Sequence, residues 1–314
     1  MTYPLRVVSY NILADCYVRV PDQPWNAFTH CTEEHLVYTE RFPRIIEKLI
    51  QSNADVILLQ EVMFEKRNDI WQLPEDLVVA LQAQGYQCVM QGLKQKEIAS
   101  NALRNERMVG RAIPTGLAVC WKEERFTEFD DSKGRSGSGM TLYLQLKECH
   151  NCVLCLNNIH LVGDPQQFSQ HLKQLEGAKK QLNNVTVLDS IKKGTVTNVF
   201  DLICGDFNGD IITASDEGEI VPSTIGEWFR DNEFHRASTG ISWASDTNSA
   251  RLDHVMYRCR QQEGAGLITC EPHLCFPRQS DEIDTSLIGG LPNEFHPSDH
   301  VMVQVDFSID CPTI

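Results

Sequence analysis

The sequence lacks the features that mark membrane, fibrous and disordered proteins. Its 314 residues contain no apolar run long enough to span a bilayer, no Pro/Ser-rich linker, no low-complexity tract and no internal repeat. Hydrophobic residues make up 42% of the chain and charged residues 23%, which is the composition of an ordinary globular protein. Disorder, collagen and coiled coil are therefore excluded.

Basic residues are scarce. The chain has 28 Lys and Arg against 43 Asp and Glu, and its formal net charge is −15. Such a surface repels polyanions at long range, so a nucleic acid must be captured locally, by a metal site or a small basic patch. A sequence-reading DNA-binding module is not expected.

The cysteines do not have the pattern of a disulfide framework. Many of the 12 lie inside apolar runs, as do Cys120, Cys155 and Cys204, which predicts reduced, buried thiols. The N-terminus passes into a strand-like run without a basic leader and apolar stretch. We therefore expect a cytoplasmic or nucleocytoplasmic protein with no membrane segment.

Short β-branched apolar runs recur along the chain and predict more strands than helices. The expected strands are Arg6–Ile12, Asp55–Gln60, Gly116–Trp121, Thr141–Leu146, Val153–Ile159, Val199–Cys204, Leu252–Tyr257 and Val301–Phe307. The expected helices are Glu40–Gln51, Pro74–Ala83 and a longer one from an N-cap at Asp164 to Val185. Many strands are too close in sequence for a helical crossover, so the pattern predicts α/β layers with mixed or antiparallel sheets.

We expect one domain over residues 1–314, because no linker divides the chain. Two segments, Lys133–Gly139 and Gln261–Gly266, have the composition of exposed loops. The polar segment Gln91–Arg111 is poorly periodic and carries Arg111, so it is predicted to be a mobile loop near a ligand, or else a solvated surface loop.

Polar residues gather where the predicted strands end. They are Asn11, Gln60, Glu61, Asn158, His160, Asp206, Asn208, Ser298, Asp299 and His300. Because ends of neighbouring strands converge at one edge of a sheet, these residues are expected to line one cleft. Any one of them alone is better explained by a turn, a cap or a core contact. Together, their carboxylates, amides and imidazoles form the set of groups that binds a hard divalent cation and activates water against a phosphate ester.

Six motifs in order extend this interpretation. They are YNILAD at 10–15, LLQEV at 58–62, NIHL at 158–161, GDFN at 205–208, LDHV at 252–255 and PSDH at 297–300. In order and spacing the series resembles the endonuclease/exonuclease/phosphatase superfamily over nearly the whole chain. The resemblance implies a two-sheet β-sandwich flanked by helices, in four α/β/β/α layers, with the active site at one end.

Finer matches resemble the branch of deadenylases, nocturnin, Angel proteins and 2′-phosphodiesterase. They are Leu36, Tyr38 and Arg41 before or in the first helix, and LPNEFHPSDH at 291–300. Two positions depart from that branch: Thr115 stands where Asp is usual, and Ser242 precedes Trp243 where many members have Asn before an aromatic residue.

The resemblance assigns roles to the polar cluster. Glu61, assisted by Asn11, is expected to hold Mg²⁺, for which Mn²⁺ can substitute, with further ligands from Asp206, Asn208 and His300. Asp206 is expected to orient and deprotonate water or to hold a second ion, and Asn208 to position the phosphate or the metal. His160 and His300 are expected to face the phosphate, and Asp253 and Asp299 to fix histidine tautomers. Expected substrate contacts are Asn158, Arg111 and Trp243, the last by stacking on a base.

Our first hypothesis is a Mg²⁺-dependent phosphodiesterase on RNA, a 3′-to-5′ exoribonuclease that removes adenosines and releases nucleotide 5′-monophosphates. The alternative keeps the site and changes the substrate to a small nucleotide or an RNA terminal phosphate, which the acidic balance favours. A DNA-repair or lipid phosphodiesterase ranks lower. A non-catalytic adaptor is disfavoured because Glu61, His160, Asp206 and His300 are all present.

Overall fold

Two six-stranded sheets form the centre of the molecule. The computed structural model describes residues 2–19, 28–136, 139–164, 167–214, 220–238, 240–245, 247–261, 270–276 and 285–310. The first sheet has the order β17 (Cys270–Phe276), β18 (Val303–Asp310), β1 (Thr2–Asn11), β2 (Val56–Met63), β6 (Thr115–Lys122) and β5 (Tyr86–Met90). The second has the order β13 (His235–Arg236), β16 (Asp253–Gln261), β10 (Asn198–Asp206), β9 (Cys152–His160), β8 (Gly139–Leu146) and β7 (Phe126–Ser136).

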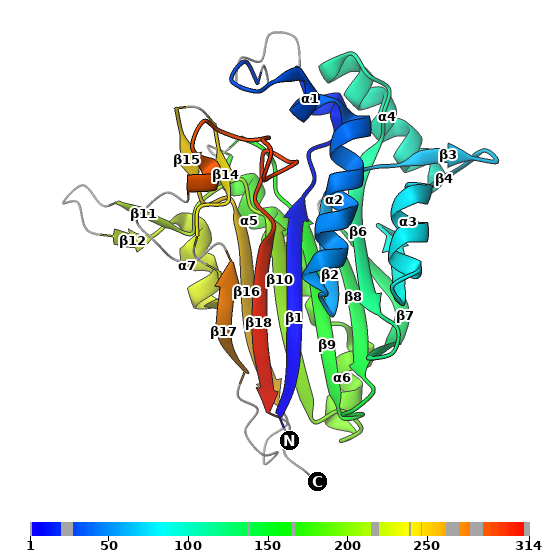
Figure 1. Ribbon diagram of the computed structural model, residues 1–314. Helices are drawn as coiled ribbons and strands as arrows, with labels where there is room; N and C mark the ends of the chain where they lie inside the picture. Colours follow the sequence, from blue (N-terminus) through cyan, green and yellow to red (C-terminus); the bar gives the residue numbers. More distant parts are fainter. Residues whose placement is uncertain are drawn as a thin grey trace.

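Helices and short hairpins surround these sheets (Figure 1). The helices are α1 (Glu33–Leu36), α2 (Tyr38–Ser52), α3 (Glu75–Gln82), α4 (Gln95–Val109), α5 (Phe168–Leu182), α6 (Val185–Lys192) and α7 (Thr224–Asp231), with the 3₁₀ turns η1 (Asp15–Tyr17) and η3 (Thr285–Leu287). The hairpins are β3–β4 (Glu65–Arg67, Ile70–Gln72), β11–β12 (Ile212–Ala214, Ile220–Pro222) and β14–β15 (Trp243–Ala244, Ser249–Ala250). No described helix combines the length and apolar character needed to cross a bilayer.

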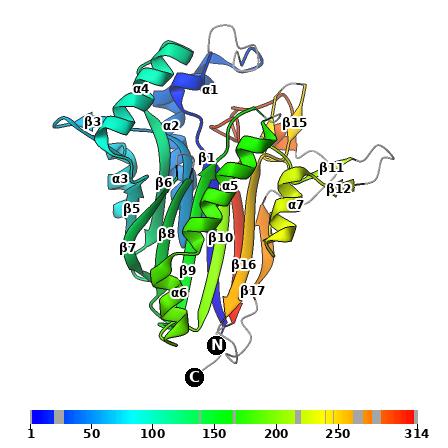
Figure 2. The ribbon, with the colours of Figure 1, turned by 180° about the vertical axis from the view of Figure 1, so that it is seen from behind.

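The core consists of three apolar layers. Between the sheets, Val7 and Leu58 of the first sheet belong to the same buried cluster as Leu156 and Leu202 of the second. The outer face of the first sheet packs against α2 and α3, and that of the second against α5 and α7 (Figure 2). Each strand therefore has apolar residues on both faces, which explains its continuous β-branched run. The predicted sandwich flanked by helices is confirmed.

Parallel and antiparallel pairs mix within each sheet, as predicted. β1 runs parallel to β2 and β9 parallel to β10, while β1–β18, β2–β6 and β10–β16 are antiparallel. All eight predicted strands are present, with bounds that differ by a few residues. The strands β5, β7 and β17 were not predicted.

Two predicted helices are confirmed as α2 and α3, and the third is corrected at both ends. The long helix begins at Phe168 with Gln167 as its N-cap, so Asp164 does not cap it. It ends at Leu182, and Asn184 then caps α6 with its side chain, which accepts a hydrogen bond from the Thr186 amide. Asn competes for backbone hydrogen bonds outside helices, which explains the break.

The prediction of a loop over Gln91–Arg111 is wrong. Residues 95–109 form α4, which begins where the Lys94 backbone amide donates a hydrogen bond to the Glu97 carboxylate and ends at Gly110 in the left-handed conformation. Its buried face consists of Ile98, Ala102, Asn105 and Val109, at helical spacing. Because only two of these four residues are strongly apolar, the sequence pattern does not predict this helix.

The other two loop predictions have different outcomes. Lys133–Ser136 lies in β7, where Gly134 pairs with Thr141 and Arg135 with Met140 of β8, so the loop expected over Lys133–Gly139 is wrong there. Pairing with β8 overrides the weak strand propensity of Gly and Ser. The loop expected at Gln261–Gly266 lies outside the described residues apart from Gln261, which ends β16.

Arg41 connects α2 to the polar end of the first sheet. Its side chain is fully buried and donates hydrogen bonds to the carbonyls of Leu36, Ile12, Leu13 and Pro297. Buried carbonyls need donors, and one guanidinium supplies several in a fixed planar array. Arg41 therefore holds the end of β1 beside the segment that precedes His300.

We expect Arg41→Ala to lower the free energy of unfolding by at least about 3 kcal/mol, because it leaves several buried carbonyls without donors. Urea unfolding followed by circular dichroism measures this change. Arg104→Ala removes an exposed arginine of α4 and should change stability by less than about 0.5 kcal/mol. Equal effects of the two substitutions would contradict the role given to Arg41.

Candidate active site

The alternation of side chains along three adjacent strands of the second sheet places polar residues inside the sandwich at one end. Asp206 of β10 is directly opposite His160 of β9 on one side and Asp253 of β16 on the other. Leu202 and Val255 belong to the cluster between the sheets, and Asp206 and Asp253 lie on those same faces of β10 and β16. All three polar side chains are therefore directed toward the first sheet.

A β-bulge in β2 positions Glu61. The pairing of β2 with β6 shifts register between Leu59 and Val62, and Glu61 has a φ of 58°. Leu59 and Val62 both belong to the outer cluster. Glu61 is thus the extra residue of the bulge, which turns its carboxylate toward the site, and a positive φ in a Glu is strain of the kind found at functional positions.

Asn11, at the end of β1, joins the acidic groups of the two sheets. Its side-chain nitrogen donates to Glu61 Oε1 at 3.0 Å and to Asp206 Oδ2 at 3.0 Å. Its side-chain oxygen accepts a hydrogen bond from the Leu13 amide, which sets the orientation of the side chain. The Ala14 amide donates to Glu61 Oε2 at 2.9 Å. Two buried carboxylates from different sheets are therefore held by one amide.

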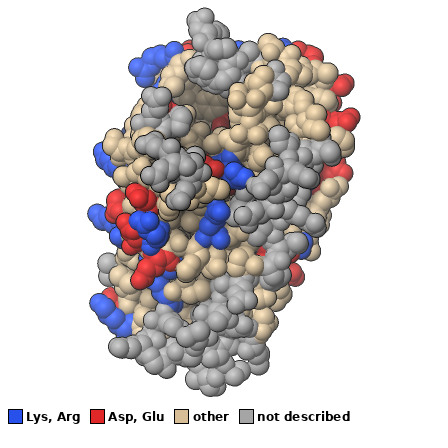
Figure 3. Space-filling view, turned by 90° about the vertical axis from the view of Figure 1, so that its left-hand side faces the viewer, with Lys and Arg blue, Asp and Glu red and all other residues tan. Residues whose placement is uncertain are grey.

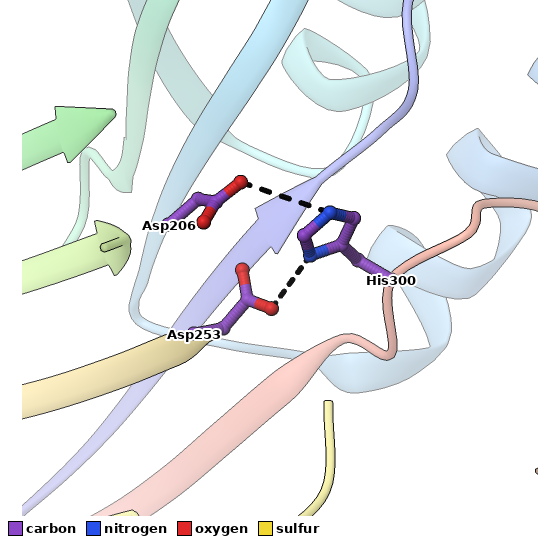
Figure 4. Close-up of side chains that lie close together, drawn as sticks. All are labelled: Asp206, Asp253 and His300. Atoms are coloured by element: carbon purple, nitrogen blue, oxygen red, sulfur yellow. Dashed lines mark hydrogen bonds and ion pairs between the residues drawn. The ribbon is translucent and has the colours of Figure 1, made fainter. Parts of the chain in front are cut away.

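The imidazole of His300 lies beside the carboxylates of Asp206 and Asp253 (Figure 4). Its Nδ1 is 2.7 Å from Asp253 Oδ2, and its Nε2 is 3.7 Å from Asp206 Oδ2. His160 Nε2 is 3.6 Å from the same Asp206 oxygen and 3.9 Å from Glu61 Oε1. The site is thus a row of alternating acids and imidazoles with Asp206 at its centre.

Three further contacts surround His300. Trp243 of β14 forms a β-bridge with His300, and the Ser242 hydroxyl accepts a hydrogen bond from the Asp253 amide. The Ser298 hydroxyl donates to the carbonyl of Asn11 at 2.7 Å. These contacts connect the last motif to the β14–β15 hairpin and to the end of β1.

Burial and charge set the protonation of the site. Burial raises the pKa of Glu61, an effect that His160 partly offsets. Burial also raises the pKa of Asp253 to about 6, against the effect of His300. Although burial opposes a charge on His300, the carboxylates of Asp253, Asp299 and Asp206 raise its pKa well above the ordinary value. These carboxylates therefore favour the charged form of the His300 imidazole, which can donate a hydrogen bond.

The donor set fits a hard divalent cation. Asp206, Asp253 and His300 each place one ligand atom within 4.8 Å of the others, the only such group of three among the described residues. The buried Oδ1 of Asp253 has no hydrogen-bond partner within the described part of the chain. Together with Glu61, these carboxylates offer oxygen atoms, which suit Mg²⁺ and Mn²⁺ better than zinc. The carboxylates thus fit a metal here, whereas the charged form of His300 has no free nitrogen lone pair with which to ligate it.

The predicted site residues divide into those that converge and those that do not. Asn11, Glu61, His160, Asp206, Asp253 and His300 come together, and Trp243 contacts the site through its bridge to His300. Asn158 is fully buried between the sheets, where it donates to the carbonyls of Leu59 and Ala118. Its amide therefore stabilises the sandwich and is not placed to bind substrate.

Three further predicted residues have other partners. Arg111 is paired with Asp15 of η1 at 2.9 Å on the rim formed by α4. Asn208 donates its side-chain amide to the carbonyl of Leu161 at 3.0 Å, while its backbone amide donates to Asp206 Oδ1. The Nδ1 of His300 is fixed by Asp253 and not by Asp299. Contrary to the prediction from the sequence, Asp299 therefore does not set the tautomer of His300. Its negative charge instead raises the pKa of Glu61 and of His300.

Sequence reasoning missed two supports of the site. Gly205 has a φ of 145°, and a Cβ there would lie 1.9 Å from the carbonyl oxygen of Ile159, so only glycine allows Asp206 to follow at this spacing. Tyr17 of η1 hydrogen-bonds to Thr115 at 3.1 Å. The glycine of the GDFN motif could have indicated the first support from the sequence. The hydrogen bond between Tyr17 and Thr115 can be recognised only in the folded structure.

Comparison with known families agrees with this geometry. The sequence profile of the Endonuclease/Exonuclease/phosphatase family matches residues 8–300. The chain belongs to this family. The match covers all the strand ends that make up the site.

Curated relatives fall into two groups. Protein angel homolog 2 of Mus musculus is 26% identical over 219 residues, which covers 66% of this chain and 35% of that protein. The mouse 2′,5′-phosphodiesterase 12 is 25% identical over 326 residues, which covers 96% of this chain and 51% of that protein. The chain thus spans about half or less of the length of these relatives.

Solved structures share the fold. The crystal structure of ANGEL2, described as a 2′,3′-cyclic phosphatase, has a TM-score of 0.64 at 19% identity and covers 98% of this chain and 95% of that one. The human Nocturnin catalytic domain with a bound sulfate anion has a TM-score of 0.58 at 17% identity and covers 99% and 97%. The mixed-sheet α/β architecture is therefore that of the family.

We expect Asp253→Asn to lower the pKa of His300, because the substitution removes the carboxylate that stabilises the charged imidazole. Below its pKa the ring is protonated, so the charged form of wild-type His300 should persist to a higher pH than that of the variant. A pH titration of the imidazole by NMR measures this shift. Asp189→Asn, on α6, is the control and should leave the titration unchanged; an equal midpoint in wild type and Asp253→Asn would refute the assignment.

Proposed function

We propose that this protein is a divalent-metal-dependent hydrolase of phosphoric esters in RNA, and specifically a 3′-to-5′ exoribonuclease that releases nucleotide 5′-monophosphates. The observation that carries the proposal is the position of Asp206. Its carboxylate lies 3.6 Å from His160 and 3.7 Å from His300 and accepts a hydrogen bond from Asn11. A base held between two imidazoles is suited to in-line attack of water on phosphorus.

Each residue then has a defined role. Glu61 is the proposed ligand of Mg²⁺, and Asn11 keeps its carboxylate at a fixed separation from that of Asp206. The bound ion supplies positive charge to a phosphate oxygen. Asp206 orients the attacking water and accepts its proton. His300, kept charged by Asp253, donates to a non-bridging oxygen as negative charge builds on the phosphate, and His160 faces the same group.

The substrate proposal rests on the surface as well as on the site. In the view of Figure 3, Lys and Arg atoms lie among Asp and Glu atoms over the described part of that face. The net charge of −15 gives no long track for a phosphate backbone. An enzyme of this kind is expected to grip the end of an RNA at the metal site, which favours exonucleolytic over internal cleavage.

A second candidate is hydrolysis of a terminal phosphate on RNA or on a small nucleotide. It is favoured by the similarity to Angel homolog 2, whose structure is described as that of a 2′,3′-cyclic phosphatase. The same Asp206, His160 and His300 would act on a cyclic ester at the 3′ end. The two candidates differ only in which phosphorus atom lies beside Asp206.

We expect purified protein with Mg²⁺ to shorten 5′-labelled RNA that ends in adenosines with a free 3′ hydroxyl, one nucleotide at a time. Parallel reactions contain the same RNA with a 2′,3′-cyclic phosphate end, or NADPH. Electrophoresis and chromatography of released nucleotides and phosphate measure the products. Opening of the cyclic phosphate without shortening, or release of phosphate from NADPH, would favour the second candidate.

Asp206→Asn and Glu61→Gln should each lower the rate by at least about 10²-fold, since each removes a charge at the reacting phosphate. Asp189→Asn removes a carboxylate from α6, at the opposite end of the molecule (Figure 2), and should retain wild-type activity. EDTA should abolish the reaction and added Mg²⁺ should restore it. Full activity of Asp206→Asn would refute both candidates.

A further inference from the structure

Two cysteines lie directly opposite each other on neighbouring strands, away from the acidic site. Cys88 of β5 pairs with Cys120 of β6 in the antiparallel register. Direct cross-strand partners point to the same face of a sheet, and here that face carries the cluster formed with α2 and α3.

The hydrogen-bond pattern of this strand pair defines how close the two residues lie. The Gln91 amide donates to the carbonyl of Leu117, and the Glu123 amide donates to that of Gly85. Hydrogen-bonded pairs alternate along an antiparallel ladder, so Cys88 and Cys120 occupy a non-hydrogen-bonded pair. At such pairs the Cα atoms are about 4.5 Å apart, within the range that a disulfide spans without backbone movement.

The two thiols differ in access. Cys120 is fully buried, whereas Cys88 is half-buried on β5, the edge strand of the first sheet. Both are reduced in this structure. A thiol-reactive molecule in solution therefore reacts with Cys88 first. Cys120 is the cysteine placed to displace that molecule from the sulfur of Cys88.

We propose that Cys88 and Cys120 are an oxidation site, which forms a reversible cross-strand disulfide with a low-molecular-weight disulfide such as oxidised glutathione. Cys88, as thiolate, attacks one sulfur of that reagent, forms a mixed disulfide and releases one thiolate. Cys120 then loses its proton and attacks the sulfur of Cys88, which releases the second thiolate. Two protein thiols are oxidised, and one disulfide is reduced to two thiols.

The second step is the slow one. The neighbouring Cys88 and burial raise the pKa of Cys120 well above its ordinary value, and burial persists in the mixed disulfide, so little of Cys120 is thiolate at neutral pH. The mixed disulfide on Cys88 should therefore accumulate early and decay into the internal disulfide.

The disulfide would close a loop that contains α4. The segment between the two cysteines begins in β5, passes through α4 and returns in β6. This segment also carries Arg111 and Thr115, which contact Asp15 and Tyr17 of η1. Both ends of the helix at the rim of the active site would then be tied to the sheet, and the edge strand could no longer separate from β6.

The test uses the whole chain, reduced and freed of reductant, then treated with oxidised glutathione below its unfolding temperature. Free thiols are blocked with N-ethylmaleimide, and a non-reducing tryptic digest is analysed by mass spectrometry. We expect the peptides that contain Cys88 and Cys120 to be joined, after a transient glutathione adduct on Cys88. Because the cross-link restrains the unfolded chain, the Tm of the oxidised protein should rise by about 5 °C.

Cys88→Ser and Cys120→Ala each remove one partner, and circular dichroism checks that each variant folds. In Cys88→Ser the joined peptides and the rise in Tm should both be lost, and in Cys120→Ala the glutathione adduct should persist. Reducing agent should reverse the change in wild type. Wild-type Cys88 that keeps glutathione, remains free to react with N-ethylmaleimide or joins a different cysteine would overturn the proposal.

Discussion

The amide of Asn11 is the contact on which the site depends. It donates to Glu61 from its own sheet and to Asp206 from the facing sheet, so it sets the separation of two buried carboxylates that would otherwise repel each other. The side chain itself is oriented by the Leu13 amide, and the end of β1 is held in turn by Arg41. The geometry of the site at the end of the sandwich therefore depends on the conformation of the last residues of β1.

Strand register supplies the remaining geometry. His160, Asp206 and Asp253 are neighbours across β9, β10 and β16, and a period of two along each strand directs them inward. Glu61 breaks this period, because regular alternation would turn it to the outer face. The bulge in β2 corrects its direction at the cost of a positive φ. The backbone strain at Glu61 is thus what directs its carboxylate into the site.

The reaction class and the substrate depend on different parts of the molecule. The acids and imidazoles suit attack on a phosphorus atom whatever group it carries, which explains how one family includes a 2′,5′-phosphodiesterase and a protein described as a 2′,3′-cyclic phosphatase. We propose that selection among substrates depends on the rim, where α4 and the β14–β15 hairpin lie near η1 and His300. The proposed disulfide would act on that rim and not on the reacting groups.

Local sequence patterns predict the eight central strands, the layered α/β class and the residues that end those strands, because continuous β-branched apolar runs and strand-end polarity are local signals. Tertiary structure decided what each of those residues does. Asn158 had the same polar, strand-end signal as His160 but lies between the sheets, and the weakly apolar face of α4 concealed a helix. Which side chain meets substrate depends on the facing sheet, and no local pattern records that contact.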